Sequence, residues 1–303
     1  MERPRTFEEK VLNRVIITGD KYGENTGPSF VSYNLDFKVQ DIIYTPELND
    51  TQYEGCGRET HRPFGITSDD TYLYVVSHSK MAKYNLEDLT YAGLLDIPLY
   101  LNTHQILYVK DMMITCNSSN DTLGFHYIGN PNNTVETKYF DISTQQWSEH
   151  CKIVGDCNVC DKLHVNSLFY KDNELYFCCH NKGKKNSDFY VMTLDNRDVT
   201  HYKECGYECH NIIVDDDFYT LSSGTQELYI NDSRITITDQ GFLRGLSKHD
   251  NKLYIGHDDG NLNASVKIFD LEERVIINDI SKPIMINEIP IEHFDHITDI
   301  KII

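Results

Sequence analysis

A degenerate repeat with a histidine at matched points constrains this chain more than any other feature. Each repeat opens on an apolar run, crosses a turn rich in Asp and Asn, and enters a second apolar run. The histidines at the matched points are His104, His164, His210 and His296. Two further segments follow the same repeat but have Phe64 and Arg244 at the matched position instead of histidine. Such units cannot bury their apolar faces alone, so the pattern predicts repeats that pack on one another.

Strand signals dominate each repeat. Short runs of Val, Ile, Tyr and Phe alternate with turn pairs such as DD, DN and NG. Residues 62–97 contain RPFGIT, YLYVVS, KMAKYNL and YAGLLDI, which predict four strands over about forty residues, the length of a propeller blade. We therefore expect an all-β fold, a six-bladed β-propeller that spans residues 1–303 as a single domain. A two-domain arrangement or a β-sandwich is the alternative.

The two ends of the chain complement one another. The last repeat, HITDIKII, ends after a single strand, whereas residues 14–45 hold three strand candidates without an inner strand before them. Pairing the C-terminal strand with the N-terminal blade would leave no open sheet edge at this point. We expect Ile297–Ile303 to lie beside Val15–Thr18 in one sheet.

Composition narrows the classes of function. The net charge is −19 and the sequence contains no basic stripe, which argues against a nucleic-acid partner. No apolar run reaches the length of a membrane span, and the charged N-terminus MERPRTFEEK does not resemble a signal peptide, so no membrane partner is expected. Nine cysteines in such a chain favour reduced thiols and a cytoplasmic location.

The matched histidines suggest a metal site. The start of an innermost propeller strand faces the axis, so imidazoles from separate blades would converge there. Neutral imidazole is a common ligand of Zn, Fe, Mn and Cu, and we expect a divalent transition metal held by His104, His164, His210 and His296. Histidines that only bridge neighbouring blades are the alternative. Eight other histidines we interpret as surface residues: His61, His78, His126, His150, His180, His201, His249 and His257.

Polar neighbours of these histidines suggest a substrate. Arginine binds carboxylate or phosphate through two oxygens at once, and amides orient rings or contact ligands. The candidates for binding a small anionic molecule are Arg62, Asn166, Asn211 and Arg244. The working hypothesis is a metal-dependent enzyme, a hydrolase or lyase acting on a sugar acid or lactone, with metal redox chemistry left open. The competing hypothesis is a non-catalytic propeller that binds a protein or a glycan. The sequence does not fix the oligomeric state.

A cysteine cluster is the weaker second candidate. Cys151, Cys157 and Cys160 include a CxxC pair, but a second CxxC is missing, so a structural zinc site there is disfavoured.

Several short motifs occur in the order seen in a known family. RPFGI, THQI, LHVNSL, CHNI and FLRGLS resemble the RPMG, HDI, HLNG, PHSPR and RGLA landmarks of an uncharacterised bacterial β-propeller family, a domain of unknown function. The resemblance covers about residues 62–256. It implies a propeller with Arg62, His104, His164, Asn166, His210 and Arg244 in its funnel. The chain lacks the arginine of PHSPR, because Asn211 and Ile212 follow His210.

Overall fold

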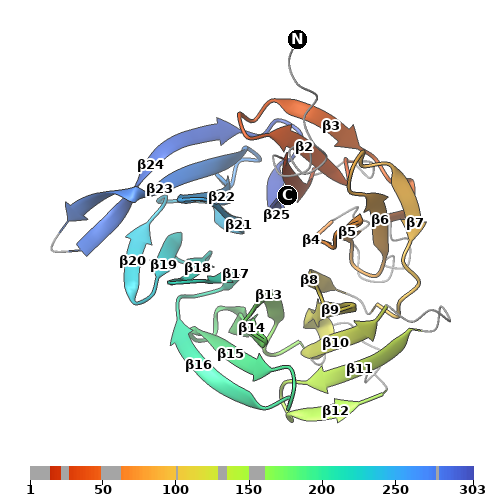
Figure 1. The fold of residues 1–303 in the computed structure, drawn as a ribbon. Helices are drawn as coiled ribbons and strands as arrows, with labels where there is room; N and C mark the ends of the chain where they lie inside the picture. The colour runs from red at the N-terminus through yellow and green to blue at the C-terminus, as the bar shows by residue number, and fades with distance from the viewer. Residues whose placement is uncertain are drawn as a thin grey trace.

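The described residues form six antiparallel sheets around a central axis, as a six-bladed β-propeller (Figure 1). The computed structural model describes residues 14–21, 27–48, 63–99, 102–128, 135–149, 161–277 and 280–303. The predicted fold class is confirmed. Within these ranges, no helix is long and apolar enough to cross a membrane.

The blades follow one another in chain order, each from its innermost strand outward. The first has β4 (Gly65–Ser68), β5 (Tyr72–Val76), β6 (Met81–Asn85) and β7 (Tyr91–Leu94). The second has β8 (Thr103–Val109), β9 (Met112–Asn117), β10 (Thr122–Tyr127), β11 (Glu136–Asp141) and β12 (Gln146–Ser148). The third has β13 (Val165–Lys171), β14 (Glu174–Cys179), β15 (Ser187–Thr193) and β16 (Val199–Cys205).

The remaining three blades complete the ring. The fourth has β17 (Cys209–Val214), β18 (Phe218–Ser222), β19 (Glu227–Ile230) and β20 (Ser233–Thr236). The fifth has β21 (Phe242–His249), β22 (Lys252–Asp258), β23 (Ala264–Ile277) and β24 (Ile280–Pro290). The sixth has β25 (His296–Ile302), β1 (Arg14–Asp20), β2 (Phe30–Asn34) and β3 (Val39–Ile43). Short 3-10 turns occur at η1 (Pro46–Leu48), η3 (Ser118–Asn120) and η4 (Asn181–Gly183).

The sixth blade is built from both ends of the chain, as the sequence predicts. β25 pairs antiparallel with β1, with Val15 opposite Ile302 and Ile17 opposite Ile300. β25 is the innermost strand and contacts β4 of the first blade and β21 of the fifth. The ring is therefore closed by main-chain hydrogen bonds between the two ends of the chain.

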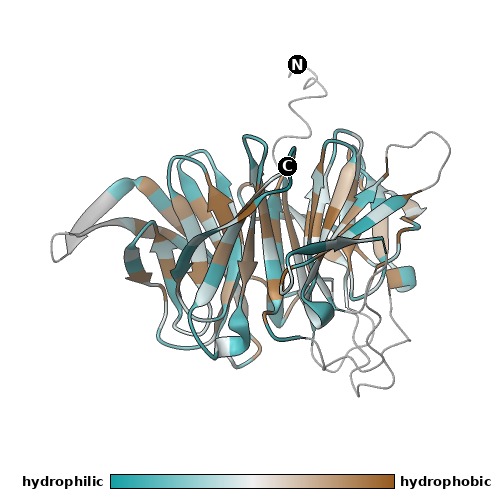
Figure 2. Cartoon of the chain, turned by 90° about the horizontal axis from the view of Figure 1, so that it is seen from below, coloured by the Kyte–Doolittle hydropathy of each residue, from teal (hydrophilic) through white to brown (hydrophobic). Residues whose placement is uncertain are grey.

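Hydrophobic contacts between neighbouring blades form the core. Side chains alternate across a strand, and in these sheets both faces are covered by another blade. In β1, Val15 and Ile17 pack towards the fifth blade, whereas Ile16 packs towards the first. Strands buried on both faces therefore read as continuous apolar runs, and Figure 2 shows hydrophobic residues along the strands and hydrophilic residues in many of the turns.

Closure of the ring predicts a measurable contribution from β25. Ile300 is 3% exposed in the apolar cluster between the fifth and sixth blades, and Ile42 of the same sheet is 39% exposed. Ile300→Ala should lower the free energy of urea unfolding by about 3 kcal/mol, because it leaves a cavity. Ile42→Ala should change it by less than about 0.5 kcal/mol. If the two substitutions lowered the free energy of unfolding equally, the buried side chain of β25 would not be what stabilises the closed ring.

Candidate functional site

Bulges at the start of the inner strands decide where the axial side chains lie. In β17 the extra residue is Asn211, directly after His210. In β13 it is Asn166, and in β25 it is Thr298, each two residues after the matched histidine. His210 is therefore one position out of register with His164 and His296. The matched points of the sequence repeat are equivalent only to within one residue.

Bulge residues and the adjacent Asp299 join several of the blades to one another, and we call this group the axial clasp: Gln105, Asn166, Asn211, Thr298 and Asp299. Gln105 Oε1 accepts a hydrogen bond from the Leu168 amide at 2.5 Å. Asn166 Nδ2 donates to the Cys209 carbonyl at 2.9 Å. Thr298 Oγ1 donates to the Pro63 carbonyl at 2.5 Å. Each of these bonds crosses from one blade to the next.

Asn211 and Asp299 tie together four blades of the ring. Asn211 Oδ1 accepts from the Gly245 amide at 2.8 Å, and its Nδ2 donates to Asp299 Oδ1 at 3.2 Å. The other oxygen of Asp299 accepts from the Ile66 amide at 3.2 Å. Gly245 has a φ of 77°, and a Cβ there would lie 2.9 Å from the Ile300 side chain, so glycine is required at this contact. Asn166 and Asn211 are thus engaged within the protein, and direct contact of either with a substrate stays a prediction.

Aromatic rings follow one another along the axis in a continuous arc. We call the imidazoles His78, His104, His164, His180 and His210, with the rings of Phe64 and Phe242, the histidine arc. Ring centroids are 4.8 Å apart between His104 and His164, 4.7 Å between His164 and His180, and 5.1 Å between His180 and His210. The predicted His104, His164 and His210 therefore do lie together, with His180 inserted between the last two.

Two phenylalanines belong to the arc, Phe64 between His78 and His104 and Phe242 beside His210. Phe64 lies 4.7 Å from His78 and 4.8 Å from His104, centroid to centroid. Phe242 lies 5.2 Å from His210, and the Arg244 guanidinium sits over the Phe242 ring at 4.9 Å. Arg244 thus joins the arc at its far end.

Hydrogen bonds assign the tautomer of His210. Its Nδ1 lies 2.8 Å from the Glu208 carbonyl, which only accepts, so Nδ1 carries the proton. Ser223 Oγ also lies 2.8 Å from Nδ1 and donates its own hydrogen to the Leu243 carbonyl, so it accepts from His210 as well. Nε2 is left with a lone pair. It is buried and has no hydrogen-bond partner within the described part of the chain.

Carboxylates contact the Nδ1 atoms of two further imidazoles, as the Glu208 carbonyl does in His210. His164 Nδ1 lies 2.9 Å from Asp161 Oδ1, and His296 Nδ1 lies 2.8 Å from Asp258 Oδ2. A carboxylate on Nδ1 leaves Nε2 as the nitrogen available to a ligand. His180 differs, because its Nδ1 accepts from the Lys182 amide at 3.0 Å, and its Nε2 therefore carries a proton.

The backbone around His164 is held in place by a neighbouring blade. His164 has a φ of 54°, an uncommon value for a residue other than glycine. The carboxylate of Asp121 accepts from the amides of Lys162, Leu163 and His164, the last at 2.8 Å. These hydrogen bonds offset the unfavourable backbone conformation of His164 and fix the start of β13 relative to the second blade.

Burial keeps three imidazoles of the arc, those of His104, His180 and His210, neutral at pH 7. Burial lowers the pKa of His210 well below its ordinary value, and the nearby Arg244 charge acts in the same direction. Burial, with further effects of His164 and Arg244, also lowers the pKa of His104 and brings that of His180 to about 3. Arg244 therefore places a positive charge beside three unprotonated imidazoles.

A cavity of about 20 Å³ lies where the arc meets the clasp. His104, His210 and Arg244 line it, together with clasp residues that include Asn166 and Asn211. Its volume fits one water molecule, one ion or one oxygen of a larger ligand.

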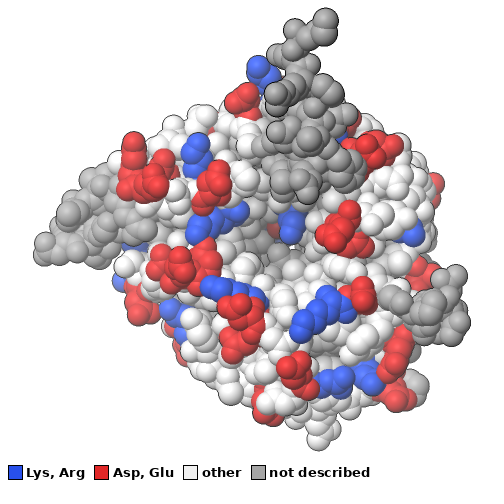
Figure 3. All heavy atoms as spheres, in the orientation of Figure 1, with Lys and Arg blue, Asp and Glu red and all other residues white. Residues whose placement is uncertain are grey.

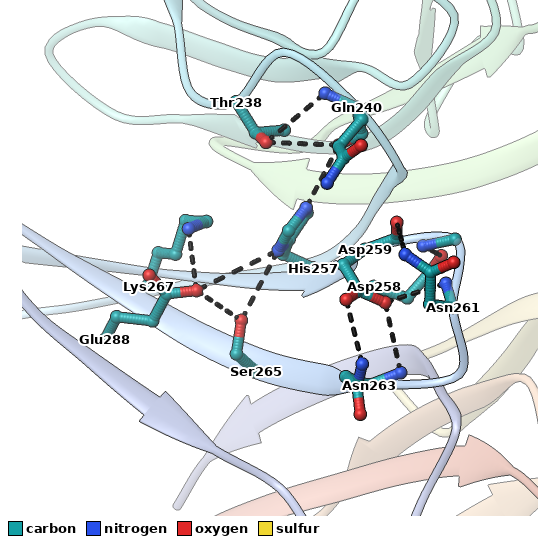
Figure 4. A network of polar contacts seen from close by, with 11 residues as sticks. Thr238, Gln240, His257, Asp258, Asp259, Asn261, Asn263, Ser265, Lys267 and Glu288 are labelled. Carbon is teal, nitrogen blue, oxygen red and sulfur yellow. Dashed lines mark hydrogen bonds and ion pairs between the residues drawn. The ribbon is translucent and has the colours of Figure 1, made fainter.

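Several sequence predictions need correction or stay untested. His78, His126, His180 and His257 are buried rather than on the surface. Two of them belong to the arc, whereas His126 bonds Thr115 and Thr137, and His257 bonds the Gln240 carbonyl and Ser265 in the network of Figure 4. Arg62, His61, His150, Cys151, Cys157 and Cys160 lie outside the described residues. His180 and His78 fall outside the repeat frame, which is why the sequence pattern missed them.

Histidine is a suitable metal ligand, but the arrangement of the described residues does not support the predicted metal site. Among the described residues, no three His, Cys, Asp or Glu side chains are placed together so that they could hold a metal ion. His104, His164 and His210 are linked by ring contacts through His180, whereas His296 pairs with Asp258. A metal at these histidines stays a prediction.

Comparisons with known proteins establish the fold. No family model matches the chain, and no curated protein matches it in sequence. A chain in a crystal structure of a nidogen/laminin complex superposes with a TM-score of 0.62 at 11% identity, over 95% of this chain and 97% of that one. A putative 6-phosphogluconolactonase from Bacteroides fragilis superposes with a TM-score of 0.56 at 11% identity, over 99% and 100%. At this identity the likeness supports the propeller fold alone.

The neutral histidines predict a loss of stability in acid. Their folded-state pKa values are lowered, so their contribution is present above the unfolded pKa of about 6.5 and is lost as the pH falls below it. Urea unfolding between pH 7 and 4 should show a smaller decline for His104→Gln than for the wild type. His249→Gln, outside the arc, should follow the wild type. Parallel curves for all three proteins would contradict a buried neutral arc.

The clasp predicts a structural role for Asn211. Asn211→Ala removes bonds to Gly245 and Asp299 and places alanine at a φ of 58°. We expect the free energy of unfolding to fall by about 2 kcal/mol or more, as measured in urea. An unchanged value would mean that these bonds do not hold the ring.

Proposed function

We propose that the histidine arc is a hydrolytic centre for a small anionic ester or lactone, such as the lactone of a sugar acid. The observation that carries the proposal is the free Nε2 of His210. This nitrogen is buried and unprotonated, its ring is fixed by Glu208 and Ser223, and the residue lines a cavity that fits one water.

His210 is the proposed general base. A water in the small cavity would give its proton to Nε2 while its oxygen attacks the carbonyl carbon of the substrate. The carbon–oxygen bond to the leaving group then breaks, and the leaving oxygen takes the proton from the imidazolium. His180 adds an N–H donor in the same arc for oxygen that becomes negatively charged.

Arg244 is the proposed anchor for the anionic group. Its charge already opposes protonation of His104 and His210, so an anion bound beside it would relieve this repulsion. Substrate binding should therefore be favoured by a positive local potential within a chain of net charge −19. The name of the Bacteroides neighbour is compatible with this reaction class, but the proposal rests on the arc.

A matched pair of lactones tests the proposal. Glucono-1,5-lactone and its 6-phosphate differ by one anionic group, and acid release in a pH-stat measures hydrolysis above the spontaneous rate. We expect faster turnover of the phosphate, and a loss of about 10²-fold or more in kcat for His210→Gln. His201→Gln, on an exposed outer strand, is the control and should retain activity. No turnover of either lactone by the wild type would reject the proposal.

The anchor has its own test. Arg244→Lys keeps the charge and loses the two-pronged geometry, so KM for the phosphorylated lactone should rise about tenfold, and Arg244→Ala should raise it further. KM for the neutral lactone should change little. If both variants kept the wild-type preference, Arg244 would be a bridge between blades.

A histidine-held metal is the second candidate at the same place. The Nδ1 contacts of His164 and His210 leave the Nε2 atoms of these two residues for an external ligand, as is usual for metal-binding histidines. Metal analysis of protein purified without a histidine tag should find one equivalent, lost in His164→Ala and retained in His201→Ala. Metal-free protein with full lactonase activity would reject this candidate.

The same experiments distinguish an enzyme from the alternative, a propeller that binds a ligand without catalysis. Saturable binding of 6-phosphogluconate without turnover of either lactone would identify a binding module.

A further inference from the structure

A second and larger cavity occupies the axis on the other side of the clasp. Its volume is about 550 Å³, the size of a site for a small organic molecule. All six inner strands line it, and it shares Gln105 and Asp299 with the small histidine-lined cavity. Figure 3, a view down the axis, shows the ring hollowed at its centre with basic atoms inside the hollow.

Just over half of the wall of this axial cavity is apolar. The apolar lining side chains that are partly exposed include Leu107, Phe169, Tyr170 and Ile302, whereas aliphatic lining residues such as Ile66 and Ile300 are buried between blades. Burial of a hydrocarbon against such a wall is favourable by about 25 cal/mol per Å². The cavity therefore suits a ligand with a small apolar body.

Lys301 brings a positive charge into this apolar surrounding. Its side chain lines the cavity and is half-buried, and this burial lowers the pKa of its ammonium group. Within the described ranges, no residue forms a hydrogen bond or ion pair with its ammonium group. A buried cation without such a partner is unfavourable, so an anionic ligand would gain from pairing with it.

The other charges of the cavity are already engaged or lie at its mouth. Asp299 acts on Lys301 electrostatically, but its carboxylate accepts from the amides of Ile66 and Ile300 and from Asn211. Lys248 forms an ion pair with Asp215, whose carbonyl also accepts from Lys171. Asp250 is exposed in the turn after β21. Lys301 is thus the cation available to a ligand inside the cavity.

We propose that this axial cavity is a second ligand site, which binds a small monocarboxylate with an apolar body through Lys301. The carboxylate pairs with the ammonium group, and the hydrocarbon part lies against the apolar part of the wall. The site is independent of the histidine arc, because the clasp separates the two cavities.

Calorimetric titration with hexanoate and hexanamide tests the site, since the two probes share shape and differ in charge. Hexanoate should bind at least tenfold more tightly than hexanamide. Lys301→Met should abolish this difference, Lys301→Arg should keep most of it, and Lys252→Met, on the exposed end of β22, should behave as the wild type. Equal binding of the two probes by the wild type, or no binding of hexanoate, would overturn the proposal.

Two further variants show whether the probe occupies this cavity rather than the histidine arc. His210→Gln should leave hexanoate binding unchanged, so loss of lactone hydrolysis and loss of this site are distinguishable. Ser247→Phe narrows the cavity and should weaken both probes. Lys301→Met should melt no lower than the wild type, because it replaces an unpaired buried charge with an apolar chain. Unchanged hexanoate binding in folded Lys301→Met would place the probe elsewhere.

Discussion

Pairing of β25 with β1 is the interaction that holds the ring together. Every blade packs on two neighbours, so the apolar faces of the first and fifth blades stay covered only if the sixth blade is complete. That blade combines residues about 280 positions apart in the chain, as the hydrogen bond between Thr298 and Thr18 illustrates. A chain that brings such distant segments together closes its largest loop late, because loop closure has an entropic cost.

Closure also creates the axial chemistry. Once the inner strands meet, their bulges direct polar side chains towards the neighbouring blade. The clasp then lies between a small cavity lined by histidines and a larger one. Some residues both join the blades and line the two cavities. Asp299 shows this most clearly, since it binds Ile66 and Asn211 and borders both cavities. Burial raises its pKa to about 6, so the layer between the cavities contains a group that titrates near neutrality.

The two cavities call for different ligands. The histidine arc presents nitrogen lone pairs, one N–H and a guanidinium around a space for a single oxygen, which suits polar chemistry at a carbonyl group. The axial cavity combines apolar side chains with the ammonium group of Lys301, which suits retention of an amphipathic anion. Both proposals use a positively charged side chain within an acidic protein. The net charge of the rest of the chain favours solubility.

Strand periodicity and turn residues are local and repeat along the chain, so the propeller, its six blades and its closing strand could be predicted from the sequence. The same repeat predicted that His104, His164 and His210 lie together. It did not predict that His180 and His78 join them, because only the starts of the inner strands were matched, and these two residues follow the second strand of their blades. The tautomer of His210, the lowered pKa values of three buried histidines and the clasp contacts of Asn166 and Asn211 emerge only in the folded ring. Those properties depend on burial and on partners from other blades, such as Asp299 for Asn211, which one-residue bulges place and which spacing along the chain does not reveal.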